Sequence, residues 1–322
     1  MSGVVAAPEE TVIRLTIPSH PGHPFILYIR VQTIRKSIYM SALQLEGRTL
    51  VVATMHGKET IILPPLEARL GVRGVVAPGL DTDRFGTFTG EIPREGSPLE
   101  AARRKVLAAL DDTGESLGIA SEGSFGPHPA IPFMAADVEL LLLVDRDNDL
   151  ELVAQEISPD TNYGRRVCRT LAEVETFARQ VLFPSHALIV HGGDLLEKDL
   201  VTKGVADPAR LREAAGGVLS RHGTVTVETD MRAFHNPSRM RVIAKATEAL
   251  LQKLASPCPS CGWPGFVPKE KIPGLPCAWC GEPTSLALAV VSGCDRCGHT
   301  HRQPYPDGLR KSDPAYCDEC NP

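Results

Sequence analysis

The chain has 322 residues, of which 43% are hydrophobic and 23% charged, with a formal net charge of −5 at pH 7. Its longest uninterrupted apolar run, Leu286–Val291, is far too short to cross a bilayer, which argues against a membrane protein. A chain of this length should form two folded units. Because no secretory signal is recognisable, we expect a cytoplasmic protein.

Residues 1–39 differ in pattern from the rest of the chain. They carry two short β-like runs, Thr11–Ile17 and Phe25–Val31, around a stretch rich in proline and histidine, and no amphipathic helical pattern. We expect an N-terminal extension that is flexible or packed only peripherally. A second methionine, Met40, precedes the first convincing strand, so translation could start at Met1 or at Met40.

From residue 49 onward, strand-like and helix-like patterns alternate. Strands are predicted at 49–54, 72–77, 117–120, 138–144, 150–157, 187–191 and 225–228, and helices at 58–70, 97–110, 171–182, 208–219 and 237–254. The helix at 97–110 has the clearest start, because Ser97 can cap it and Glu100 completes a capping box. Pro64 and Pro65 are expected to reset the start of the helix at 58–70. The alternation predicts a layered α/β domain with a mixed sheet over residues 40–257.

Polar residues gather in the segments expected to follow the strands, where open α/β sheets bind ligands. Lys58 and Arg94 could neutralise phosphate charge, and His56 and His128 could act as general acid or base. Carboxylates that could hold Mg²⁺ or contact substrate are those of Asp81, Asp83, Glu91 and Glu122. Each of these residues alone is more often an ordinary loop residue. Neither a Walker A motif nor a Gly-x-Gly-x-x-Gly fingerprint is present.

The C-terminal segment, residues 258–322, contains eight of the nine cysteines. They form the Cys-x-x-Cys pairs Cys258/Cys261, Cys277/Cys280, Cys294/Cys297 and Cys317/Cys320. Separations of 15 residues between the first two pairs and 19 between the last two are typical of four-cysteine zinc ribbons. We predict two structural zinc ions, with the sulfurs of each set about 3.5–4 Å apart. Sequential pairing is the simplest assignment, and a cross-braced arrangement of the same ligands is the alternative.

The charge of this small double zinc-ribbon module bears on its partners. It contains six Lys or Arg and seven Asp or Glu residues, and four thiolates per zinc would add negative charge. Nucleic acid is therefore disfavoured, since phosphate-binding modules need a basic face. A protein partner of the module is compatible with this charge. Leu286–Val291 is expected to be a strand that links the two halves of the module.

Part of the chain resembles the house-cleaning inosine/xanthosine triphosphate pyrophosphatases. The resemblance covers residues 49–157 and lies in Thr54-x-His56-x-Lys58-Glu59 after a strand, in the helix from Ser97, and in Ser121-Glu-Gly-Ser. It implies that Lys58 contacts phosphates, that Glu122 holds Mg²⁺ or positions water, and that Thr54 and His56 line the phosphate loop. This sequence departs from the family pattern where His56 replaces Asn, where the spacing to Lys58 is one residue shorter, and where the Asp-Asp pair is missing.

After Met40, the chain also resembles an uncharacterised bacterial family, a domain of unknown function. The shared motifs stand at 53–59, 86–91, 120–129, 228–233, 236–240 and in the paired cysteines. This resemblance implies no known activity, but it adds Arg232 and Arg239 as candidate ligand-binding residues at a strand-to-helix junction. Asn236 nearby could instead simply cap the long helix, with Pro237 in its first turn.

These observations favour a Mg²⁺-dependent hydrolase of a nucleotide-like phosphate ester or anhydride, with the zinc module as a lid or partner platform. The alternative is a non-enzymatic zinc-ribbon protein that binds a ligand or a partner.

Overall fold

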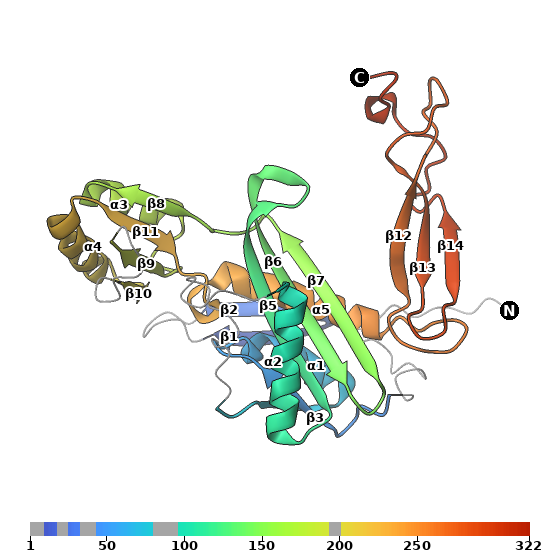
Figure 1. Ribbon diagram of the computed structural model, residues 1–322, viewed down its shortest axis with the longest axis horizontal. Helices are drawn as coiled ribbons and strands as arrows, with labels where there is room; N and C mark the ends of the chain where they lie inside the picture. Colours follow the sequence, from blue (N-terminus) through green and yellow to red (C-terminus); the bar gives the residue numbers. More distant parts are fainter. Residues whose placement is uncertain (1–9, 18–24, 33–42, 80–95, 193–200) are drawn as a thin grey trace. The chain divides into compact units, whose positions relative to one another are not determined.

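The computed structural model describes residues 10–17, 25–32, 43–79, 96–192 and 201–322. The chain divides into two compact units, the first comprising Met1–Arg35 and Leu45–Leu250 and the second Lys36–Gln44 and Leu251–Pro322. Figure 1 shows the described elements, coloured from blue near the N-terminus to red near the C-terminus. Within the described part of the chain, no helix combines the length and the apolar character that a bilayer span requires.

The first unit is built on a mixed five-stranded sheet, as the alternating pattern predicted. The strands are β3 (Thr49–Ala53), β4 (Arg73–Val76), β5 (Leu117–His128), β6 (Ile131–Asp145) and β7 (Leu150–Ser158), in the order β4-β3-β5-β6-β7. β4, β3 and β5 are parallel, whereas β5, β6 and β7 form an antiparallel meander. β5 is much longer than predicted, because Ser121–His128, expected to be a loop, pairs with β6 almost to the hairpin turn.

Helices cover both faces of this sheet. On one face, α2 (Pro98–Thr113) packs Val106 and Leu110 against a cluster that includes Leu140 and Leu142. On the opposite face, α1 (Glu59–Leu70) buries Ile61, Ile62 and Leu66 completely, and α5 (Pro237–Leu254) lies on that side as well (Figure 1). Because side chains alternate along a strand, consecutive residues of β5 and β6 belong to different faces.

The helix starts follow the local signals, with one exception. Ser97 accepts a hydrogen bond from the Glu100 amide and Glu100 returns one to the Ser97 amide, which confirms the predicted capping box. α1 differs from the prediction: it begins at Glu59 and runs through Pro64 and Pro65. The amides of Ile61 and Ile62 both bond to the Lys58 carbonyl, so the helix is already established before the prolines remove two later donors.

A second sheet in the first unit has four antiparallel strands in the order β10-β9-β11-β8. They are β8 (Arg165–Cys168), β9 (Leu188–His191), β10 (Thr202–Val205) and β11 (Val225–Thr229). α3 (Leu171–Gln180) and α4 (Pro208–His222) contribute Phe177, Leu211 and Val218 to its hydrophobic core. The sequence did not predict β8 and β10, which are short and partly exposed. The two N-terminal β-like runs form an antiparallel hairpin of β1 (Glu10–Ile17) and β2 (Phe25–Gln32).

The second unit contains an antiparallel three-stranded sheet of β12 (Val267–Pro273), β13 (Ala287–Gly293) and β14 (Thr300–Pro304). β13 confirms the strand predicted at Leu286–Val291. Residues 258–266 precede β12 and residues 294–299 join β13 to β14, so these segments meet at one end of the sheet. Residues 274–286 and 305–322 lie at the other end. This strand arrangement decides which cysteines can meet.

Candidate functional site

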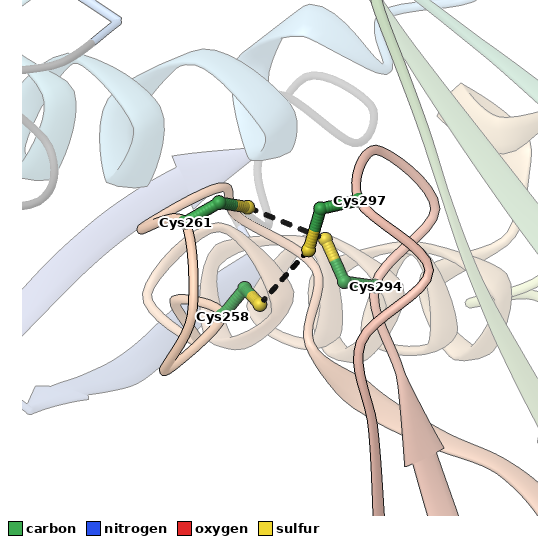
Figure 2. Close-up of side chains that lie close together, drawn as sticks. All are labelled: Cys258, Cys261, Cys294 and Cys297. Carbon is green, nitrogen blue, oxygen red and sulfur yellow. Dashed lines mark hydrogen bonds between the residues drawn. The ribbon is translucent and has the colours of Figure 1, made fainter.

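The cysteines of the second unit converge in two groups of four. Cys258, Cys261, Cys294 and Cys297 form the first group, and Cys277, Cys280, Cys317 and Cys320 form the second. Within each group the sulfur atoms all lie within 4.8 Å of one another. Figure 2 shows the four sulfurs of the first group pointing toward a common centre, with Sγ–Sγ distances of 3.7 Å for Cys258–Cys297 and for Cys261–Cys294. The corresponding distances in the second group are 3.8 and 3.6 Å.

The pairing is cross-braced, so the simpler sequential assignment was wrong. The first cysteine pair precedes β12 and the second follows it. A strand of 7 residues separates its ends by about 20 Å, at roughly 3.3 Å per residue, so these two pairs cannot share one metal ion. The turn between β13 and β14 instead brings the third pair to the first, and the segment after β14 brings the fourth pair to the second.

Local backbone geometry prepares each group for a metal ion. Gly262, Gly281 and Gly298, which follow the second cysteine of the first three pairs, have φ values of 74°, 83° and 71°. Only glycine adopts this left-handed conformation without cost, so the tight turns predicted after the cysteines are present. The Trp279 amide points at the Cys277 sulfur at 3.4 Å. Four convergent sulfurs with such amide support fit the needs of a tetrahedral metal site.

Two of the polar residues predicted in the first unit, Lys58 and Arg239, belong to a buried polar cluster, which they form with Ser121, Asp137 and Glu139. β3 ends opposite Ala120, while β5 continues beyond it. His56 and Gly57, with φ values of 71° and 74°, then turn the chain back toward β5. As a result, the buried Lys58 Nζ donates to the Ser121 Oγ at 3.0 Å and to the Ser121 carbonyl at 3.4 Å.

The centre of the buried polar cluster is an ion pair between α5 and β6. The Arg239 Nε donates to the Glu139 Oε1 at 2.6 Å, and both side chains are almost completely buried. A Cβ atom at Gly123, which lies opposite Glu139 on β5, would overlap both Arg239 and Glu139. The guanidinium also lies 5.1 Å from the centroid of the Phe125 ring. Arg239 is thus fixed against the sheet by an ion pair, by a cation–π contact and by the absence of a side chain at Gly123.

Asp137 completes the buried polar cluster. It stands two residues before Glu139 on β6, so both carboxyl groups belong to the same face of the sheet. Asp137 is fully buried, and among the residues that the structure describes neither of its carboxyl oxygens, nor the Glu139 Oε2, receives a hydrogen bond. Burial and the neighbouring Glu139 raise the pKa of Asp137 to about 8. Burial, followed by repulsion from Arg239, lowers the pKa of Lys58 to about 8.

Glu122 lies on the other face of the sheet. It stands opposite Leu140, which packs against α2, and its carboxylate forms a buried ion pair with the Lys105 ammonium of that helix. Ser121, the next residue along β5, belongs to the face that carries Lys58. The Glu122 carboxylate and the Lys58 ammonium therefore lie on different faces, although Glu122 is near enough to oppose the lowering of the Lys58 pKa.

The other predicted residues have various surroundings. Thr54 is buried at the end of β3, and its hydroxyl bonds to the Met55 carbonyl. The His56 ring lies 5.4 Å from the Phe234 ring, in the 3₁₀ turn η4 (Ala233–His235). Arg232 is held by a bidentate pair with the buried Asp230.

His128 lies in the β5–β6 hairpin turn, where its Nδ1 accepts a hydrogen bond from the Ala130 amide. It follows Glu122 on the strand by six residues, or about 20 Å, which separates it from the buried polar cluster. Asp81, Asp83, Glu91 and Arg94 lie outside the described residues.

Asp137 and Glu139 were missed at the sequence level. The available signal was a carboxylate at Glu139 immediately before the apolar run Leu140–Val144, which would require a buried partner. The partner lies 100 residues away in Arg239, a residue predicted only from its motif. The alternative for Asn236 is confirmed, since its side chain caps α5 by accepting from the Arg239 amide at 3.0 Å.

A family model matches more than half of the chain. The model of a family described as Domain of unknown function (DUF6671) matches residues 105–322, a stretch that includes Asp137, Glu139, Arg239 and all eight paired cysteines. No curated protein matches the chain. The family resemblance carried by the motifs and cysteines is therefore confirmed. The comparisons do not return the inosine/xanthosine triphosphate pyrophosphatases.

Proposed function

We propose a function from the residues themselves, since the chain belongs to the family described as Domain of unknown function (DUF6671). Each cysteine quartet holds one zinc ion, and the zinc ions are structural. The observation that carries this proposal is the convergence of four sulfurs to within 4.8 Å of one another in each quartet, with two Sγ–Sγ distances of 3.6–3.8 Å in each. Four thiolates are the ligand set of structural zinc and leave no coordination position open for substrate.

Metal analysis of the purified protein tests the zinc proposal. We expect about two zinc ions per chain, the number that eight cysteines can hold as four-thiolate sites. Cys258→Ser and Cys277→Ser should each lower the count by about one, because each quartet loses a ligand independently of the other. A count near zero in protein purified without chelator would contradict the proposal, as would loss of both ions in either variant.

The first unit supports a second proposal, that the protein hydrolyses a nucleotide-like phosphate substrate. Lys58 and Arg239 supply two cationic groups on one face, just beyond the carboxyl end of β3, and carboxylates stand beside them. In this role Lys58 and Arg239 would neutralise phosphate charge, and Glu139 would orient the guanidinium. Open α/β sheets bind ligands at this edge.

Mg²⁺ would supply further charge neutralisation at the phosphates. Apart from the cysteine quartets, the described residues contain no group of three His, Cys, Asp or Glu side chains close enough to hold an ion. A Mg²⁺ ion used here would therefore arrive with the substrate phosphates, with at most one or two protein carboxylates as ligands.

A matched pair of variants tests the hydrolase proposal. The pyrophosphatase resemblance implies that Glu122 holds Mg²⁺ or positions water. The geometry of the buried polar cluster instead favours Glu139 as the functional carboxylate, because it would orient the Arg239 guanidinium. Glu122→Gln and Glu139→Gln each remove the charge of a buried ion pair, so their costs in stability should be similar. In a screen of nucleotides and phosphate esters, with and without Mg²⁺, we expect Glu139→Gln to lose activity and Glu122→Gln to keep it.

No phosphate release by folded, zinc-loaded wild-type protein would end the hydrolase proposal. It would leave the alternative of a non-enzymatic ligand- or partner-binding protein. Loss of activity in Glu122→Gln, with activity kept in Glu139→Gln, would instead support the role that the pyrophosphatase resemblance implies for Glu122.

A further inference from the structure

The buried polar cluster contains carboxylate oxygens to which the described residues donate no hydrogen bond. Three oxygen atoms, both of Asp137 and the Glu139 Oε2, are buried without a donor among the described residues. Burying an ionised carboxylate without hydrogen bonds costs several kcal/mol, so such a group takes up a proton or a cation instead. Which of the two it binds depends on the charges around it.

The surroundings favour a proton over a metal ion. The charged groups near the carboxyl pair are the ammonium of Lys58 before α1 and the guanidinium of Arg239 on α5. The Glu122–Lys105 pair on the α2 face brings no net charge. Two cations already offset two carboxylates, so a divalent ion would add two uncompensated charges to a buried site. One proton shared between Asp137 and Glu139 supplies the missing donor at a far lower electrostatic cost.

We propose that Asp137 keeps a proton at neutral pH and donates it to Glu139, which leaves one net positive charge on the buried polar cluster and makes it a binding site for a phosphate-type anion. The charge follows from Lys58 and Arg239 as cations, Glu139 as the single anion, and Asp137 as a neutral acid. The anion class rests on the proposed hydrolase function, whereas the shared proton does not. Because the half-buried Phe125 ring lies over the Arg239 guanidinium, anion entry requires that side chain to turn away.

Raising the pH should close the anion site. The pKa values of Asp137 and of Lys58 are both about 8. Above that pH Asp137 gains a negative charge while Lys58 loses its positive charge, so the net charge of the cluster changes from +1 to −1. Phosphate should bind the protonated form of the cluster. For each proton that the cluster must hold to bind phosphate, the affinity should therefore fall by up to about tenfold per pH unit above the pKa.

Infrared spectroscopy of the intact protein tests the shared proton directly. We expect the carbonyl stretch of a protonated carboxylic acid at pH 7, its disappearance as the pH is raised through about 8, and its absence in Asp137→Asn. Glu122→Gln is the control and should keep the band. The inference is overturned if wild-type protein shows no such band at pH 7, or if the band persists in Asp137→Asn. Because the wild-type titration suffices by itself, a poorly folding variant does not remove the test.

Titration calorimetry with inorganic phosphate tests the anion site. We expect binding at pH 6.5 and an affinity at least tenfold weaker at pH 9.5. Between pH 6.5 and 9.5, the affinity of Asp137→Asn should decline less steeply than that of wild type, since Lys58 alone then titrates. No phosphate binding at pH 6.5, or an equally steep decline in Asp137→Asn, would overturn the anion site. Phosphate binding without any hydrolysis would instead remove the proposed hydrolase function and support this inference.

Discussion

The sheets of the two units are stabilised by different means. In the first unit, β3 is buried along almost its whole length, and α2 buries a continuous apolar stripe against its sheet. In the second unit, β12 and β14 are largely exposed, and only Ala289, Val290 and Gly293 are buried within β13. The first unit thus folds by burying apolar surface, whereas the sheet of the second unit buries little, and the proposed metal–thiolate bonds would take the place of an apolar core there.

Chelation should give the largest difference between the two units. Removing the metal from the cysteine quartets should unfold β12–β14, because structural zinc sites supply most of the folding free energy of small metal-binding modules. The first unit should keep its far-UV circular dichroism and its amide protection, since its cores do not involve the cysteine quartets. Hydrogen exchange before and after chelation checks this. Unchanged protection of β12–β14 after complete metal loss would contradict the comparison.

Within the first unit, the buried charges are the exception to apolar packing. Glu139→Gln should lower the free energy of unfolding by about 3–5 kcal/mol, because it leaves the buried Arg239 without its anionic partner. Urea unfolding of the zinc-loaded protein measures the change. A loss below about 1 kcal/mol would mean that the guanidinium finds water or another partner.

Asp137→Asn should raise the free energy of unfolding at pH 7, whereas Glu139→Gln should lower it. The pKa of Asp137 is raised from its usual value near 4 to about 8 on folding, so its contribution to stability is fully present below pH 4 and is lost as pH rises toward 8. Asparagine needs no proton, so the variant should be more stable than wild type at pH 7, by at most about 4 kcal/mol. The difference should vanish near pH 4. Thermal unfolding at both pH values checks the sign, and a variant less stable at pH 7 would refute it.

The two tryptophans provide a matched pair inside the second unit. Trp263, beside the first quartet, lies 3.9 Å below the Arg296 guanidinium and is partly buried, whereas Trp279, inside the second quartet, is 79% exposed. Trp263→Ala should therefore destabilise the module by about 2 kcal/mol, and Trp279→Ala by less than about 0.5 kcal/mol. Chelator concentration at half-unfolding gives both values. Equal losses of stability in the two variants would show that the exposure of each tryptophan does not determine its contribution.

The smallest effect is expected from deleting residues 1–39. The β1–β2 hairpin is a separate two-stranded sheet that adds no strand to the others. The melting temperature of the remaining chain should change by less than a few degrees. A larger decrease would show that the hairpin contributes to the core of the first unit.

The local features of this protein could be predicted from nearby residues in the chain. Ser97 with Glu100 and Asn236 with Pro237 mark helix starts, because capping depends on residues within one turn. Cysteine spacing and the glycines after the second cysteine of the first three pairs indicated metal-binding turns for the same reason. Family membership followed from the motifs and the paired cysteines.

Features that depend on residues far apart in the chain could be read only from the three-dimensional fold. The cross-braced pairing of the cysteines follows from the length and direction of β12–β14, which no Cys-x-x-Cys motif encodes. Alternation along β5 decides that Ser121 faces Lys58 while Glu122 faces Lys105, and a shift of one residue would exchange them. Asp137 and Glu139 acquire their chemistry from burial and from Arg239, which reaches them from 100 residues away. Burial and long-range contact create such groups, and neither is written in the spacing of nearby residues.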